Sequence, residues 1–285
     1  VISSHGFSYH CYADDTQLIF SFPPSDTTAS ARISACLSDI SLWMSAHQLK
    51  LNPSKTELLV IPGDSSPGQD LQITLNDSLL SPSATDLNLG VTMDNELSFF
   101  PHVANVARSC RFLLYNIRRI RQFLSIQAPQ MLFQSLVIPR LDYCTSLLAG
   151  LPLNAIRPLQ MIQNAAARLV FNQPKFSHTT PLLRSLHWLP VAARIRFKTL
   201  MLAYKAKNGP APSYLSDLIT SRTAPHCLRS SSTARLVPPS LRMRGKYNSR
   251  LFSVLAPKWW NELPLDVRKA ESLIIFKRRL KTYLF

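Results

Sequence analysis

Residues 7–22 read FSYHCYADDTQLIFSF, and this stretch decides how the first part of the chain is interpreted. Two short aromatic, β-rich runs, Phe7–Tyr12 and Thr16–Phe22, flank the tripeptide Ala13-Asp14-Asp15. Runs of this kind on either side of turn-forming residues predict a β-hairpin. We expect the hairpin to be buried, with two acidic side chains at its tip.

The adjacent carboxylates Asp14 and Asp15 allow two interpretations. Acidic residues hydrate well in turns, so a pair of them often has no further role. In a tight turn, however, both can face one concave side, and two like charges held together are costly unless a cation neutralises them. Carboxylate oxygens suit Mg²⁺, and paired Mg²⁺ ions stabilise the attacking and leaving oxygens of phosphoryl transfer. Asp14 and Asp15 are therefore candidate metal ligands.

The segments after the hairpin predict a helix and more strands. Apolar side chains at 3–4 spacing predict a helix from Ser25 or Asp26 to about His47, with one face packed on the sheet. A Gly/Ser/Pro-rich loop is expected at Pro62–Asp70. Further strands are expected at Glu57–Ile61, Leu71–Leu75 and Leu87–Met93.

After Pro101 the apolar period becomes helical. The apolar stripe consists of Val103, Val106, Cys110, Leu113, Ile117 and Ile120. The opposite side carries Arg108, Arg111, Arg118 and Arg119. Such an arginine face either is solvated or binds the phosphates of a nucleic acid. The absence of acidic residues over 97–141 favours the second interpretation. Further helices are expected at Pro129–Val137, Leu153–Phe171, Val191–Lys207 and Ser272–Leu284.

These elements predict an α+β chain with three regions. An antiparallel sheet with a packed helix is expected over residues 1–100, a mainly helical region over 101–175, and a basic C-terminal region over 176–285. The 46% of hydrophobic residues can supply a core for a chain of 285 residues.

Charge is distributed unevenly along the chain. Residues 1–100 carry three basic and eleven acidic residues, a net −8, which leaves 29 basic and five acidic residues, a net +24, for residues 101–285. An excess of this size predicts a polyanionic partner, because each neutralised phosphate releases counterions. A basic region without a partner is the alternative.

Composition also excludes several classes of protein. The seven glycines never show the spacing of a glycine-rich nucleotide loop. The five cysteines are scattered without a C-x-x-C pair, so we expect neither disulfides nor zinc, and a reducing, intracellular setting. We expect no signal peptide and no membrane span. The abrupt start without Met suggests a piece of a longer reading frame.

Beyond the hairpin, several phrases carry a resemblance to a known family. Tyr12–Asp15, then HQLKLNPSKTE at 47–57, then Leu89-Gly90-Val91, in this order and spacing, resemble the reverse transcriptase palm of LINE-type non-LTR retrotransposons. The basic half resembles the C-terminal part of the Jockey/chicken-repeat-like group of these elements. It does so through phrases at 139–144, 163–169, 186–190 and 256–264.

The resemblance implies roles for particular residues. Asp14 and Asp15 would be polymerase carboxylates that bind two Mg²⁺ ions, with Asp14 the stronger ligand. Tyr12 and Ala13 would line the primer terminus and the nascent base pair. Lys55 would stand beside the pyrophosphate leaving group, although it could instead be an exposed lysine paired with Glu57. Leu89 and Gly90 would belong to the primer-grip hairpin, or form a plain strand with a bulge glycine.

The implied activity is RNA-directed DNA synthesis, with an RNA template, a DNA primer and dNTPs as partners. The implied location is the cytoplasm as a ribonucleoprotein, and the nucleus during target-site copying. In the family, the first catalytic Asp and the fingers subdomain lie upstream of the hairpin. We therefore expect the 285 residues to be inactive by themselves. The alternatives are a basic nucleic-acid-binding remnant without catalysis and a fragment that never folds stably.

Two aromatic phrases late in the chain have less specific interpretations. His187-Trp188 is expected to pack or stack rather than bind a metal. Trp259-Trp260 could stack on unpaired bases, but is more typical of a core. The last helix combines a packed face with a basic face, for which template RNA is the expected partner.

Overall fold

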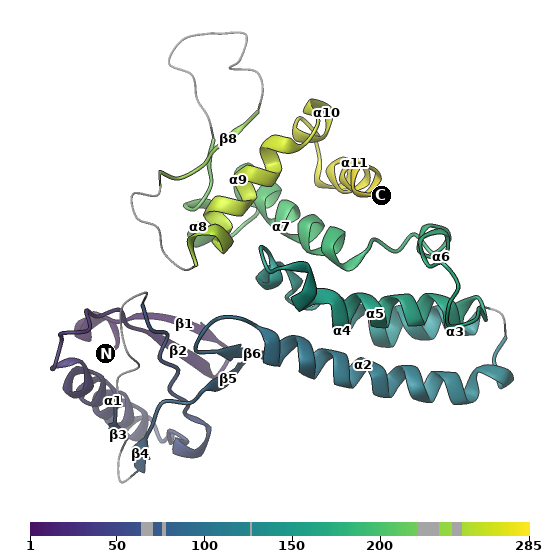
Figure 1. The fold of residues 1–285 in the computed structure, drawn as a ribbon. Coiled ribbons are helices and arrows are strands. Elements are labelled where there is room, and N and C mark those ends of the chain that lie inside the picture. The colour runs from purple at the N-terminus through teal and green to yellow at the C-terminus, as the bar shows by residue number, and fades with distance from the viewer. Residues whose placement is uncertain (64–70, 76–77, 126, 222–233, 241–246) are drawn as a thin grey trace, which may run out of the picture. The chain divides into compact units, whose positions relative to one another are not determined.

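The computed structural model describes residues 1–285 except 64–70, 76–77, 126, 222–233 and 241–246. The chain divides into two compact units, Val1–Ser98 and Phe99–Phe285 (Figure 1). Residues on both sides of position 175 belong to the second unit, and the division of residues 101–285 into two regions stays a prediction.

The first unit combines one long helix with short antiparallel strand pairs. In chain order its elements are η1 (Ser3–His5), β1 (Ser8–Tyr12), β2 (Asp15–Ile19), α1 (Ala29–Ala46), η2 (Pro53–Lys55), β3 (Ile73–Leu75), β4 (Ser78–Leu80), β5 (Thr85–Asn88) and β6 (Val91–Asp94). Strand β1 pairs with β2, β3 with β4, and β5 with β6. In the described part of this unit the strands therefore form separate hairpins rather than the expected continuous sheet.

The core of the first unit lies between α1 and β3, which are in contact. Leu37 of α1 packs with Leu71, Ile73 and Leu75, and Leu18 of β2 packs against the edge of this cluster. The predicted helix is confirmed, although it begins at Ala29. The Oδ1 atom of Asp26 accepts hydrogen bonds from the backbone N–H and the hydroxyl group of Thr28, at the entrance to the helix.

The strand expected at Glu57–Ile61 does not form. Leu58 and Val60 do pack on the α1–β3 core. A strand also needs a hydrogen-bonded partner, and within the described residues the backbone of this segment makes one such bond, from the Ser83 N–H to the Leu58 carbonyl (2.8 Å). The apolar run therefore reflects burial without a ladder of hydrogen bonds. The loop expected at Pro62–Asp70 falls largely outside the described residues.

The second unit is mainly helical. In chain order its elements are α2 (Phe100–Ile120), η3 (Arg121–Phe123), α3 (Ala128–Leu132), the π-helical turn η4 (Phe133–Val137), α4 (Ile138–Asp142), η5 (Thr145–Leu148), α5 (Leu153–Val170), α6 (Thr180–Ser185), α7 (Val191–Asn208), α8 (Ser213–Ser216), β7 (Thr220–Ser221), β8 (Leu236–Val237), η7 (Asn248–Arg250), α9 (Phe252–Glu262), α10 (Leu265–Arg268) and α11 (Leu273–Leu284). The helices expected from periodicity after residue 128 are confirmed to within a few residues, as is the helix after Pro101.

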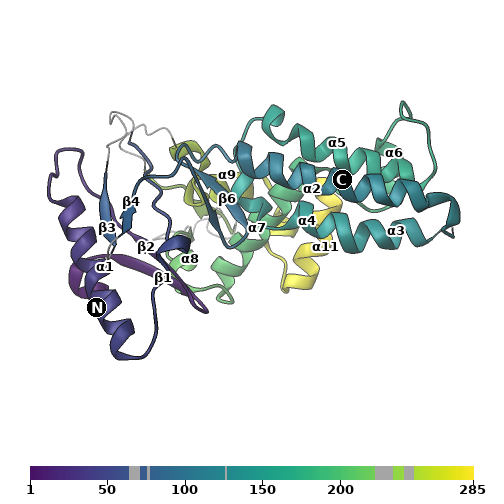
Figure 2. The ribbon, with the colours of Figure 1, turned by 90° about the horizontal axis from the view of Figure 1, so that it is seen from below.

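Helices α2 and α5 run along each other, with α3 and α4 beside them (Figure 2). The buried side of α2 holds the predicted Val103, Cys110 and Ile117. Ile120, predicted in the same stripe, is 45% exposed, because it lies in the last turn. The guanidinium group of Arg121 donates hydrogen bonds to the carbonyls of Leu169 and Val170. These bonds cap the C-terminus of α5.

A polar network joins α5 to the start of α7. The buried Gln163 donates a hydrogen bond from Nε2 to the Leu189 carbonyl (2.8 Å), and Gln160 accepts one from the N–H of Val191 (2.8 Å). Arg194 donates to the same Leu189 carbonyl (2.8 Å). Because buried polar groups are costly unless they are paired, these bonds hold the turn that precedes α7. The phrases at 163–169 and 186–190, which carry part of the resemblance, thus have a structural role through Gln163 and Leu189.

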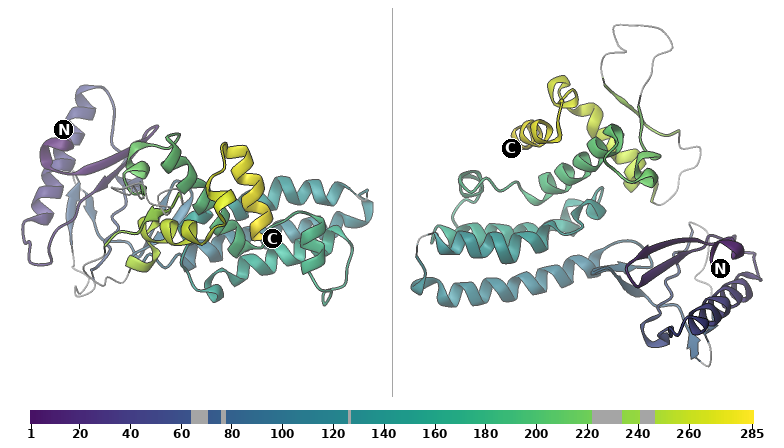
Figure 3. Two further views of the ribbon diagram at one scale, coloured as in Figure 1. Left: turned by 90° about the horizontal axis from the view of Figure 1, so that it is seen from above. Right: turned by 180° about the vertical axis from the view of Figure 1, so that it is seen from behind.

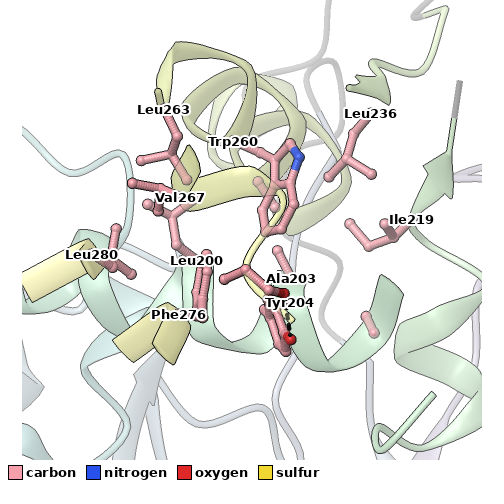
Figure 4. Close-up of a cluster of buried hydrophobic side chains, with 13 residues drawn as sticks. Leu200, Ala203, Tyr204, Ile219, Leu236, Trp260, Leu263, Val267, Phe276 and Leu280 are labelled. Carbon is pink, nitrogen blue, oxygen red and sulfur yellow. Dashed lines mark hydrogen bonds between the residues drawn. The ribbon is translucent and has the colours of Figure 1, made fainter. Parts of the chain in front are cut away.

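The remaining core of the second unit lies where α9 and α11 contact α7 (Figure 3). Trp260, Tyr204 and Phe276 stack there, with centroids 4.4 Å apart for Tyr204 and Phe276 (Figure 4). The indole N–H of Trp260 donates to the Ala234 carbonyl (2.8 Å). Trp260 and Trp188 are both buried, so the core interpretation is confirmed for these two rings, whereas Trp259 is partly buried and His187 is exposed.

None of the described helices has the length and apolar character that a membrane crossing demands. The four cysteines within the described residues, Cys11, Cys36, Cys110 and Cys144, are free thiols.

Candidate active site and nucleic-acid interface

The predicted β-hairpin is present, and the acidic pair lies at its end, with Asp14 in the turn and Asp15 at the start of β2. Tyr12 pairs directly with Asp15, so Ala13 and Asp14 are the two residues of the turn. Ala13 adopts the left-handed conformation (φ 53°), which tight two-residue hairpin turns require at their first position. The turn brings the sequence-predicted residues Tyr12, Ala13, Asp14 and Asp15 together at one end of the hairpin.

The hairpin is exposed, which corrects the expectation of a buried one. All residues of β1 are exposed, and in β2 only Leu18 is partly buried, where it contacts the core. Tyr12 is 64% exposed. The aromatic and β-branched residues of this stretch predict strands, but they do not distinguish a covered face from an open one, because both strands are only five residues long and carry apolar and polar side chains on both faces.

Asp14 and Asp15 are exposed, and neither side chain has an ion pair or hydrogen bond within the described residues. Their charges are therefore available to a cation. No group of three or more His, Cys, Asp or Glu side chains that could hold a metal ion exists in the described part of the chain. The two carboxylates fit one Mg²⁺ whose other positions are filled by water and phosphate oxygens, but by themselves they do not fit a complete two-ion site.

Lys55 ends the short helix η2, whose start is capped by Asn52. The Asn52 side chain accepts hydrogen bonds from the backbone N–H and the hydroxyl group of Ser54. Lys55 is exposed and is not paired with Glu57. Within the described residues, no hydrogen bond or ion pair joins it to Asp14 or Asp15.

Glu57 instead holds the segment after Lys55 against β5. Its Oε2 atom accepts a hydrogen bond from the N–H of Leu87 (3.2 Å), and its carboxyl group bonds to that of Asp86. Burial and the neighbouring Glu57 raise the pKa of Asp86 to about 6, whereas the bonds from Asp86 and Leu87 lower the pKa of Glu57. Asp86 therefore stays protonated to a higher pH than an exposed aspartate does, while Glu57 beside it is ionised.

The segment Leu87–Met93 forms a hairpin rather than one strand. Asn88 pairs with Val91, and Leu89 and Gly90 form the turn between β5 and β6. Both turn residues have positive φ, 46° and 80°, as type I′ hairpin turns require. Gly90 is therefore a turn glycine and not a bulge inside a strand.

The arginine face predicted on α2 is present. Arg108, Arg111, Arg118 and Arg119 are all exposed. Phe112 and Tyr115 lie on the same face, 66% and 59% exposed, and the guanidinium carbon of Arg119 stands 5.8 Å from the centroid of the Tyr115 ring. The sequence analysis named the arginines and missed these two rings. A helical wheel would have found them, since both fall within about 40° of Arg108 at 100° per residue.

The chain is 24% identical over 187 residues, 65% of its length, to a Drosophila melanogaster protein described as a probable RNA-directed DNA polymerase from transposon BS. The chain is similar to a transposon polymerase. The matched residues span 20% of that relative's length. No family model and no solved structure matches the chain.

The similarity supports a reverse-transcriptase-like relationship at the level of the family. It does not extend to the LINE-type group, to the metal or to individual residues, so the roles expected for Asp14, Asp15, Lys55, Leu89 and Gly90 stay predictions.

Proposed function

We propose that the chain takes part in RNA-directed DNA synthesis by a LINE-type retroelement, with the Ala13-Asp14 turn at the catalytic centre. The observation that carries this proposal is the pair of exposed carboxylates, without partners in the described residues, at the tip of a two-residue hairpin. The distant similarity to a transposon polymerase supports it independently.

In this proposal the reaction is nucleotidyl transfer, in which a primer 3′-hydroxyl group attacks the α-phosphate of a dNTP and pyrophosphate leaves. Asp14 and Asp15 would hold Mg²⁺, which supplies charge neutralisation at the phosphates. Tyr12 and Ala13 would contact the primer terminus. Lys55 would stabilise the charge of the leaving pyrophosphate, and the Leu89-Gly90 turn would contact the primer.

The partners that fit this proposal are an RNA template, a DNA primer and a dNTP. The exposed arginines of α2 would bind their phosphates. In this scheme the chain supplies Asp14 and Asp15 to the metal site, and a two-ion site needs further ligands. We therefore expect these 285 residues to be inactive by themselves. The expected nuclear and cytoplasmic locations stay predictions.

A second function is favoured by the same arginine face. A basic protein that binds nucleic acid without catalysis would need the net charge of +24 of residues 101–285 and the exposed arginines. It would need no metal ligands. The two functions differ in whether Asp14 matters.

Primer extension distinguishes them. The assay uses the longest reading frame that contains this chain, with a primed RNA template, Mg²⁺ and dNTPs. We expect Asp14→Asn to lower the extension rate about a hundredfold or more, the size of losing one electrostatic stabiliser. The matched control is Glu96→Gln, which neutralises another exposed carboxylate of the first unit. Equal rates for Asp14→Asn and the control would favour binding without catalysis.

A further inference from the structure

The exposed face of α2 combines two kinds of side chain. Measured from Arg108 at 100° per residue, Phe112, Tyr115 and Arg119 lie within about 40°, and Arg111 lies about 60° away. These residues therefore form one continuous strip on the side of α2 opposite to its buried residues. Arg118 lies at the edge of this strip. We call these six residues the α2 strip.

No acidic side chain in the described part of the chain pairs with the arginines of the α2 strip. Helix α2 contains no acidic residue, and no Asp or Glu occurs anywhere between residues 97 and 141. Within the described residues, Arg108, Arg111 and Arg118 have no ion pair or hydrogen bond from their side chains. Within the same residues Arg119 likewise has no ion pair, and its guanidinium group stands over the Tyr115 ring. A strip of four unpaired guanidinium groups is complementary to a polyanion.

The two rings restrict what kind of polyanion fits. Phe112 and Tyr115 are among the exposed large side chains, at 66% and 59%. In a duplex the faces of the bases are stacked on one another, so exposed rings would gain little beside it. Unpaired bases have free faces, and each can stack on an aromatic ring or on a guanidinium plane. Alternation of rings and arginines is typical of sites for single strands.

We propose that the α2 strip binds a single-stranded stretch of nucleic acid, with bases stacked on Phe112 and Tyr115 and phosphates held by the four arginines. This inference rests on the proposed function, because it names the unpaired part of the template or primer as the occupant. Arg108 and Arg119 are eleven residues apart, about 16 Å along the helix axis. At about 3.4 Å per stacked nucleotide, the strip accommodates at most about five nucleotides.

The test measures equilibrium binding by fluorescence anisotropy, without dNTPs, on the full chain. The probes are labelled oligouridine and oligothymidine of about ten nucleotides, and a blunt duplex of the same length. Phe112→Leu and Tyr115→Leu remove the ring and keep an apolar side chain. Both positions are exposed, so the fold does not depend on them. The matched control is Phe176→Leu, which removes an 89% exposed ring outside α2.

We expect each ring variant to weaken single-strand binding about tenfold, the usual cost of one lost stacking contact, with duplex binding and the salt slope unchanged. Arg108→Gln should weaken the binding of both the single-stranded and the duplex probes. The slope of log affinity against log salt concentration for the single strand should become shallower by about 0.7 per lost phosphate contact.

Three results would overturn the proposal: unchanged single-strand affinity in the double ring variant, an equal loss for the duplex, or an equal loss in Phe176→Leu. Absence of any oligonucleotide binding would also overturn it and would favour a protein as the occupant. Because binding is measured without catalysis, these results are independent of the primer-extension assay. Failure of the stacking inference and failure of the proposed function are thus distinguishable.

Discussion

The guanidinium group of Arg194 contacts both carboxylate oxygens of Asp142, with Nη1 2.8 Å from Oδ1 and 3.0 Å from Oδ2. The residues are 52 positions apart, at the end of α4 and in the first turn of α7. The same guanidinium group donates through Nε to the Leu189 carbonyl. This ion pair therefore connects the part of the second unit that contains the arginine face to the part that contains the Trp260 core.

Asp142→Asn should destabilise the second unit by about 2–3 kcal/mol, because it leaves a largely buried guanidinium group without its counter-charge. Urea denaturation of the full chain measures the change. The control is Asp217→Asn, which changes an exposed carboxylate of the same unit and should cost less than about 0.5 kcal/mol. Equal effects of the two substitutions would mean that the pair does not hold these helices together.

The pair Glu57–Asp86 should give the first unit a characteristic pH dependence. The pKa of Asp86 is raised to about 6 by burial and by Glu57, so the folded state binds more protons than the unfolded state between about pH 4 and 6. Stability from Asp86 is therefore present at low pH and lost as the pH rises through 6. The lowered pKa of Glu57 opposes this change, but the shift of Asp86 is the larger one.

Thermal unfolding followed between pH 4 and 7 tests this dependence. Asp86→Asn keeps a polar group of the same size and removes the titration, so the fall in stability between pH 4 and 6 should shrink. A profile that is the same in the parent and in Asp86→Asn would show that the pKa of Asp86 is not raised in the folded state.

The described cysteines should differ strongly in reactivity. Cys11 lies exposed on β1, whereas Cys110 is fully buried against the core, where burial raises the pKa of its thiol to about 11. The thiolate is the reactive form, so native protein should be labelled at Cys11 first and at Cys110 only after unfolding. Thiol labelling with peptide mapping measures this order. Early labelling of Cys110 would contradict the packing of α2 on α5.

Substitutions at two glycines distinguish the cost of backbone strain from the cost of steric crowding. Gly150 (φ 76°) and Gly209 (φ 93°) both adopt the left-handed region. A Cβ atom at Gly150 would lie 3.0 Å from side-chain atoms of Arg250 and Leu255, but at Gly209 it would meet nothing within 4 Å. We expect Gly209→Ala to cost about 1–2 kcal/mol from strain alone, and Gly150→Ala to cost more. Denaturation curves that rank the two variants in reverse would disprove the close approach at Gly150.

The helices of the second unit could be predicted from sequence because their signals are local. Apolar spacing and the prolines at positions 152 and 190 locate α5 and α7 to within a residue or two. The hairpin at Asp14 was predictable for the same reason, since a turn depends on adjacent residues.

Features that depend on distant partners could not be predicted. Glu57–Ile61 has the short apolar run of a strand, but only the folded chain shows that no ladder forms there. The exposure of the hairpin, the raised pKa of Asp86 beside Glu57, and the pairing of Arg194 with Asp142 depend on contacts between distant residues. Phe112 and Tyr115 could have been found, because the pattern that revealed the arginines also places them on the same face.

The most direct test of the central claim is the rate of Mg²⁺-dependent primer extension by Asp14→Asn, measured in the longest reading frame that contains the chain. If Asp14 and Asp15 hold the Mg²⁺ needed for nucleotidyl transfer, extension by Asp14→Asn falls about a hundredfold or more, while Glu96→Gln extends at the parent rate. Extension by Asp14→Asn at the parent rate would contradict the account.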